Sequence, residues 1–139
     1  MWLSIVEVDH FVAVRRKPLP FEKLEVWQDA RRIVQEVYAA TRKFRKSELF
    51  GLTSQLNRAS VSVACNLAEG AARATFKDQA HFSNQAYSSL MESACEVILS
   101  CDQGLIEPDT ADSLLLKIQT LSVRIHNLRE SQLNRAKQS

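Results

Sequence analysis

The chain has 139 residues, 45% of them hydrophobic, and a formal net charge of +2. This length suits a single domain, and this hydrophobic content is typical of a globular protein rather than a disordered one. So small a net charge does not by itself indicate nucleic-acid binding, and no apolar run approaches the roughly 18 residues of a membrane-spanning helix.

Residues 1–20 fit no helical period, and Pro18 and Pro20 separate them from the rest of the chain. Their loosely alternating hydrophobic residues are typical of an edge strand or an arm. The N-terminus lacks basic residues, and Glu7 and Asp9 interrupt its apolar start, so no signal peptide is expected. We predict a short irregular or extended N-terminal arm over residues 1–20 and a helical domain over residues 21–139.

The first helix is expected over about residues 22–44. Its apolar residues recur at spacings of three and four, which keeps them on one side of a helix. These residues are Val26, Ala30, Ile33, Val37, Ala40 and Phe44. Trp27, Val34 and Tyr38 form a second apolar stripe about 100° around the axis. A bundle buries one such face, so we expect the second stripe at a subunit interface.

The second helix is expected over about residues 48–69, followed by Gly70 as a left-handed residue that ends it. Leu52, Leu56 and Val63 lie on its predicted core face. Residues 59–68 carry no charge and are mostly small, so neighbouring backbones can approach closely. We therefore expect this helix to be enclosed on more than one side.

Two further helices are expected over about residues 76–103 and 108–134. Thr75 is placed to cap the third helix, Gly104 to end it, and Pro108 to open the fourth, where a missing N–H costs nothing. The joints between the helices are short, so consecutive helices should be antiparallel. The predicted fold is all-α, an up-and-down antiparallel four-helix bundle.

A line of polar residues follows one side of the second helix, next to its core face. Its members are Gln55, Arg58, Ser62, Asn66 and Glu69, with Arg73 just beyond the helix. We interpret this line as a polar seam that sets register or subunit contacts. The alternative is a ligand or catalytic site. The uncharged surroundings of Asn66 predict that it is buried with its amide hydrogen-bonded.

No residue pattern indicates catalysis. The only Glu-x-x-His spacing, Glu7 to His10, lies outside the bundle, and there is no Gly-rich phosphate loop. Glu92 and Glu96 are expected on a solvated acidic face opposite the core of the third helix. We therefore expect no enzyme, no catalytic residue, no metal site, no cofactor and no small-molecule substrate.

The three cysteines are Cys65, Cys95 and Cys101. An odd number of cysteines without a disulfide framework is typical of reduced thiols in the cytosol. Because the sequence also lacks a membrane span and a signal peptide, we expect a cytoplasmic protein that makes no membrane contact.

Positive charge is concentrated in the first and last helices, whereas the third is acidic. Residues 21–46 carry seven positive and four negative charges, and residues 75–107 carry one and five. Clustered cations of this kind are needed for contacts with phosphate. The candidates are Lys117, Arg124 and Arg135 on the fourth helix, and Arg31, Arg42 and Arg45 on the first. The alternatives are a solvated basic ridge or ion pairs with the acidic helix of another subunit.

Several segments resemble the four-helix-bundle proteins encoded in intervening sequences of 23S ribosomal RNA. They are Phe21–Gln28, Phe50–Ala59, Ser62–Arg73 and Ala86–Glu92, and the most specific is the run Asn66-Leu67-Ala68-Glu69-Gly70. The resemblance extends from about Phe21 to Leu133. Asn57 departs from it where a second arginine is expected, and Ser88 where glycine is expected.

The resemblance implies a homo-oligomeric ring, with a pentamer favoured. It also implies kinship with the accessory variability determinant proteins of diversity-generating retroelements, which are basic and associate with nucleic acid. Our leading hypothesis is a non-enzymatic oligomeric protein that binds RNA or DNA through a basic surface of the first and fourth helices. The alternative is a self-assembling protein-interaction scaffold with no nucleic-acid role.

Overall fold

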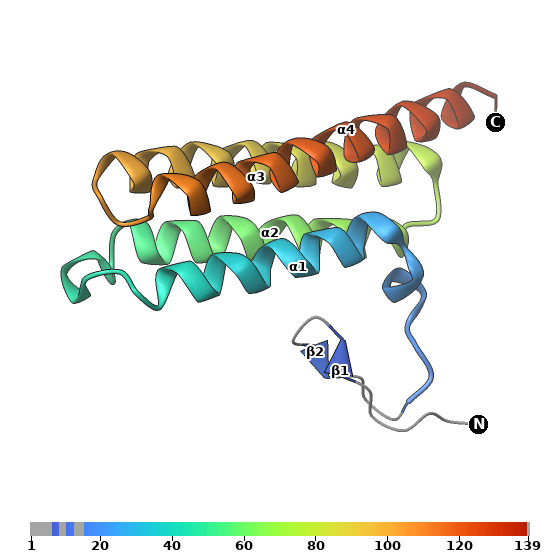
Figure 1. The fold of residues 1–139 in the computed structure, drawn as a ribbon. Helices are drawn as coiled ribbons and strands as arrows, with labels where there is room; N and C mark the ends of the chain where they lie inside the picture. Colours follow the sequence, from blue (N-terminus) through green and yellow to red (C-terminus); the bar gives the residue numbers. More distant parts are fainter. Residues whose placement is uncertain (1–6, 9–10, 13–15, 139) are drawn as a thin grey trace.

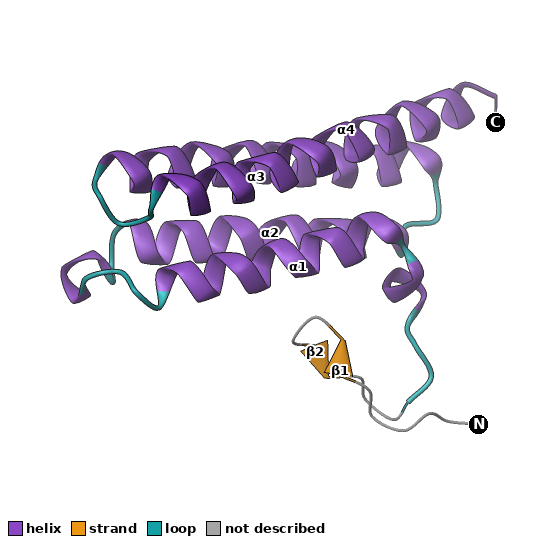
Figure 2. Ribbon diagram, in the orientation of Figure 1, coloured by secondary structure: helices purple, strands orange, loops and turns teal. Residues whose placement is uncertain are grey.

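The structure is a computed structural model that describes residues 7–8, 11–12 and 16–138. Its helices are α1 (Glu25–Thr41), α2 (Leu52–Ala71), α3 (Phe76–Asp102) and α4 (Pro108–Gln138). Each helix runs antiparallel to the one before it, and α4 packs against both α3 and α1 (Figure 1). Helices make up nearly all of the described domain (Figure 2). The predicted all-α, up-and-down bundle is confirmed.

Part of the predicted N-terminal arm is described. Two short strands, β1 (Glu7–Val8) and β2 (Phe11–Val12), pair antiparallel, with Glu7 opposite Val12 and Val8 opposite Phe11. Extended backbone at these positions agrees with the predicted arm. The prediction for residues 1–6, 9–10 and 13–15 lies outside the described residues.

The first two helices begin later than predicted because a short 3-10 helix precedes each of them. Before α1, η1 (Pro20–Lys23) ends in an extended Leu24. The Glu22 carboxylate holds this turn by accepting hydrogen bonds from the Leu19 backbone N–H and the Arg16 guanidinium. Before α2, η2 (Lys46–Glu48) is followed by Gly51, whose backbone is not helical.

Gly70 does not end α2, contrary to prediction. The helix continues through it to Ala71, and Gly70 is buried. A Cβ atom at this position would lie 3.0 Å from the Cβ of Phe82 on α3. Glycine is therefore needed here for the close approach of two helices, not for a left-handed turn. Gly104, after α3, does adopt a positive φ of 74°.

The start residues predicted for α3 and α4 are confirmed, whereas α1 ends at Thr41 rather than at the predicted residue 44. The Thr75 hydroxyl oxygen accepts a hydrogen bond from the Asp78 backbone N–H at 3.1 Å, which caps the first turn of α3. Pro108 is the first residue of α4. α3 ends at Asp102, and α4 continues to Gln138, beyond the predicted end at 134.

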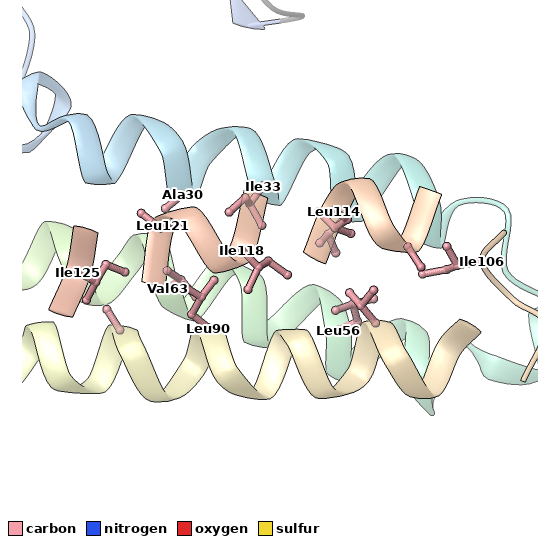
Figure 3. Packing of buried hydrophobic residues seen from close by; sticks show 14 of the residues in the cluster. Ala30, Ile33, Leu56, Val63, Leu90, Ile106, Leu114, Ile118, Leu121 and Ile125 are labelled. Carbon is pink, nitrogen blue, oxygen red and sulfur yellow. The ribbon is translucent and has the colours of Figure 1, made fainter. Parts of the chain in front are cut away.

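The core lies along the bundle axis and receives side chains from all four helices (Figure 3). Among its members are Ala30, Ile33, Leu56, Val63, Leu90, Leu114, Ile118, Leu121 and Ile125. Those on α1 and α2 fall on the apolar faces predicted from the sequence. Glu96 is a correction, because it is only 4% exposed rather than part of a solvated face. The buried surface of α3 is therefore wider than the single apolar stripe in its sequence.

Candidate nucleic-acid interface

Two of the cations predicted on α4 form ion pairs with α1 of the same chain. The Lys117 Nζ lies 2.7 Å from Glu36 Oε1, and Arg124 Nη1 lies 2.5 Å from Asp29 Oδ2. The four side chains line one groove between the two helices. Each pair joins residues more than 80 positions apart, so only the packing of α1 against α4 brings them together. The two cations are partly neutralised where a phosphate would meet them.

Two other predicted cations lie over aromatic rings. The Arg135 guanidinium carbon is 5.6 Å from the centre of the Phe76 ring, and that of Arg31 is 5.5 Å from the Trp27 ring. Trp27 also packs edge-on against Phe21, with ring centres 4.9 Å apart. Trp27, predicted at a subunit interface, therefore has partners within its own chain.

The remaining predicted cations lie at the corner between α1 and α2. Arg42 and Arg45 are exposed, as are Lys43 and Lys46, so four cations occur within five residues. We call these four residues the basic corner. Among the residues that the structure describes, none of the four forms an ion pair. It is the densest cationic surface in the described domain.

A pocket of about 290 Å³ opens beside the basic corner, between the end of α1 and the start of α2. Its wall includes Tyr38, Thr41 and Asn57, and Arg42, Arg45 and Lys46 contribute to its lining. The Thr41 hydroxyl donates to Asn57 Oδ1 at 2.8 Å. Tyr38 and Val34, both predicted at a subunit interface, are half-buried.

The tip of the same corner carries two exposed apolar side chains. Leu49 is 55% exposed and Phe50 is 93% exposed. Leu49 also contributes to the pocket wall. Neither residue could be assigned a role from the sequence. Their exposure is set by the turn between η2 and α2, whose position the sequence pattern does not show. A large apolar residue between two charged or polar segments was the only available signal.

Most of the polar seam on α2 faces α3. The Asn66 amide donates to the Ser62 carbonyl at 2.9 Å and to the Ser62 hydroxyl at 3.0 Å, and Ser62 in turn contacts the Ser89 hydroxyl at 2.9 Å. The predicted hydrogen bonding of Asn66 is thus confirmed, but the residue is half-buried rather than buried. Both hydrogen bonds of the Asn66 amide go to Ser62 of the same helix, and the Asn66 side chain remains partly exposed.

The two ends of the seam differ. Gln55, Arg58 and Ser62 line a pocket of about 350 Å³ together with Glu92 of α3. At the other end Glu69 is exposed, and the Arg73 guanidinium carbon lies 4.4 Å from the centre of the Phe82 ring. The seam therefore orders contacts between two helices of one chain.

Glu96 of α3 is a buried carboxyl group with a strongly raised pKa. Its Oε1 atom has no hydrogen-bond partner among the described residues. Burial and, to a smaller extent, the nearby Glu92 carboxylate together raise the pKa of Glu96 to about 7. Burial of a carboxyl group without a cation favours its neutral form.

The described residues contain no group of three or more histidine, cysteine or acidic side chains placed to hold a metal ion. None of the described helices is both long and apolar enough to cross a membrane.

The family model for 23S rRNA-intervening sequence proteins matches residues 22–127. The chain belongs to this family. The match confirms the resemblance found in the sequence and covers α1, α2, α3 and much of α4, including the basic corner, whereas Arg135 lies beyond it. Among curated proteins, none matches the chain.

Proposed function

We propose that this family member is a non-enzymatic, self-assembling bundle that binds RNA or DNA through its phosphate backbone, chiefly at the basic corner. The supporting observation is that Arg42, Lys43, Arg45 and Lys46 are exposed and have no acidic partner in the described domain. Lys117 and Arg124 contribute less, because Glu36 and Asp29 already pair with them. The proposal thus keeps the basic surface of α1 and reduces the role of α4.

Salt dependence tests this proposal. Each neutralised phosphate releases counterions, so four contacts give a slope of about −3 in log affinity against log salt for a single strand. Between 50 and 200 mM salt the affinity should then fall by roughly 50-fold. The measurement is fluorescence anisotropy of a labelled RNA or DNA oligonucleotide titrated with the protein at several salt concentrations.

Two sets of substitutions separate the basic corner from α4. Changing the four basic-corner cations to Gln should weaken binding and flatten the salt slope. The matched set, Lys117→Gln, Arg124→Gln and Arg135→Gln, should have a smaller effect on both. If the second set flattens the slope more than the first, α4 carries the binding surface instead. If the wild-type protein binds no nucleic acid at 50 mM salt, the scaffold alternative takes its place.

The scaffold alternative has support of its own on α3. Met91, Ile98 and Leu99 are 38–49% exposed, and the exposed Cys95 lies between them on the outer side of the helix. Apolar side chains grouped on one surface are typical of protein contacts. We propose this face as a contact between copies in a homo-oligomer, with a ring of five favoured by the family resemblance.

Light scattering tests the assembly. Ile98→Ser combined with Leu99→Ser should lower the oligomer mass, whereas Leu116→Ser on the outer side of α4 should leave it unchanged. A wild-type mass equal to one chain at micromolar concentration would contradict self-assembly. The proposal also places the protein in the cytoplasm, supported by three cysteines that are all free thiols.

A further inference from the structure

We propose that the corner between α1 and α2 prefers single-stranded nucleic acid, with an unpaired base stacked on Phe50 and the adjoining phosphates held by Arg42, Arg45 and Lys46. This inference rests on the proposed nucleic-acid binding. It adds the class of strand and the residue that recognises it.

Phe50 is the first element of the argument. A single exposed apolar residue is ordinary on a protein surface, and exposure alone does not make a site. Phe50 is distinctive because its 93% exposed ring follows Arg42, Lys43, Arg45 and Lys46 within eight positions of the chain. An aromatic platform beside a cationic surface is the combination that binds single strands, since every base has a face that can stack.

A pocket is lined by Leu49, the residue that precedes Phe50. Its volume of about 290 Å³ is near the lower end of the range for small-ligand sites, enough for part of one nucleotide. Arg42, Arg45 and Lys46 supply positive charge at its lining, and Tyr38 and Asn57 supply polar groups. Thr41 engages the Asn57 oxygen, and the Asn57 amide nitrogen makes no hydrogen bond within the described residues. Donors are therefore available next to the cations.

The neighbouring corner limits where a strand can lie. The turn between α3 and α4 lies at the same end of the bundle (Figure 1). Lys43 and Asp109 line one groove there, on the α4 side, whereas Arg42, Arg45 and Lys46 line the pocket on the α2 side. An acidic side chain repels phosphate, so the strand should follow the α2 side. Among the basic-corner cations, Lys43 should therefore contribute less to binding than Lys46.

The preference for single strands follows from stacking. Within a duplex each base is already covered by its neighbours, so the Phe50 ring gains little contact there, while phosphate contacts remain possible. A single strand can turn a base out onto the ring. Loss of the ring should thus weaken single-strand binding and leave duplex binding nearly unchanged.

The experiment compares a labelled 12-nucleotide RNA, the same strand as DNA, and each as a duplex with its complement. Phe50→Ala should weaken binding of the single strands by roughly tenfold and binding of the duplexes by less than twofold. Phe50→Trp keeps an aromatic ring and should bind the single strands as tightly as the wild type. Leu49→Ala, which removes an apolar side chain of the same turn, should have a smaller effect. Lys46→Gln should weaken binding more than Lys43→Gln. Circular dichroism and light scattering confirm that each variant keeps its helices and its mass.

The outcomes separate this inference from the function on which it rests. If Phe50→Ala binds single strands like the wild type while the basic-corner variant loses binding, the stacking platform is refuted and the phosphate-binding function stands. If Phe50→Ala weakens single strands and duplexes equally, or lowers the oligomer mass, Phe50 serves folding or a subunit contact and the inference is wrong. If the wild-type protein binds none of the four probes, both proposals fail.

Discussion

Glu96 should make the stability of the bundle depend on pH near neutrality. Glu96 is 4% exposed and leaves Oε1 without a hydrogen bond among the described residues. Arg58 of α2 lines a pocket with Glu92, but no ion pair links Arg58 to Glu96 within the described domain. The folded protein therefore favours the neutral carboxyl group, whereas the unfolded chain ionises it at its ordinary pKa.

The sign and size of the effect follow from linkage. The folded-state pKa of Glu96 is raised from 4.5 to about 7. Between these two values the folded state binds a proton that the unfolded state does not, so the free energy of unfolding falls as pH rises. At about 1.4 kcal/mol per pKa unit, the fall amounts to about 3 kcal/mol and is complete slightly above pH 7.

Glu96→Gln isolates this contribution, because glutamine has nearly the same shape and stays neutral at every pH. As pH rises from 5 to 8, the free energy of unfolding of the variant should increase relative to that of the wild type by up to about 3 kcal/mol. Urea unfolding at intervals of half a pH unit measures the difference, and histidine titration cancels because both proteins contain the same histidines.

Glu92→Gln is the matched control. Glu92 is exposed and acts on Glu96 only through its charge, so its removal should change the pH profile less and in the same direction. Parallel profiles for the wild type and Glu96→Gln between pH 5 and 8 would refute the reasoning. They would mean that the carboxyl group reaches water or a cation in solution.

Three further predictions concern packing and ion pairs. Gly70→Ala should destabilise the bundle by about 1–3 kcal/mol in thermal unfolding, because its Cβ would press on α3; an unchanged midpoint would show that the helices separate easily. A double-mutant cycle on Lys117 and Glu36 should give a coupling energy below about 1 kcal/mol that shrinks at high salt, since both side chains are partly exposed. Glu22→Gln should speed tryptic cleavage after Arg16 at pH 7, because it removes the carboxylate that pairs with Arg16, a contact that also lowers the pKa of Glu22; equal rates for the two proteins would contradict this role.

Local pattern was sufficient for the helices and most of their buried faces. Within each helix, apolar residues spaced by three and four lie on one side, and that side is buried. Ile33 of α1, Leu56 of α2 and Ile118 of α4 are examples. Thr75 and Pro108 mark helix starts through interactions with residues close to them in the chain. The family could also be recognised from sequence, because the segments that carry it lie within the matched residues.

Only the tertiary structure decided which polar residues are buried, paired or free. Glu96 was expected in solvent, but it is buried in the packed bundle. Lys117 is exposed as expected, but it forms an ion pair with Glu36 of α1, 81 positions earlier in the chain. Gly70 was expected to end a helix, but it lies within α2, where the absence of a side chain leaves room for Phe82 of α3. These outcomes depend on how helices cross and how closely they approach, and a period read along one helix contains no information about its neighbours.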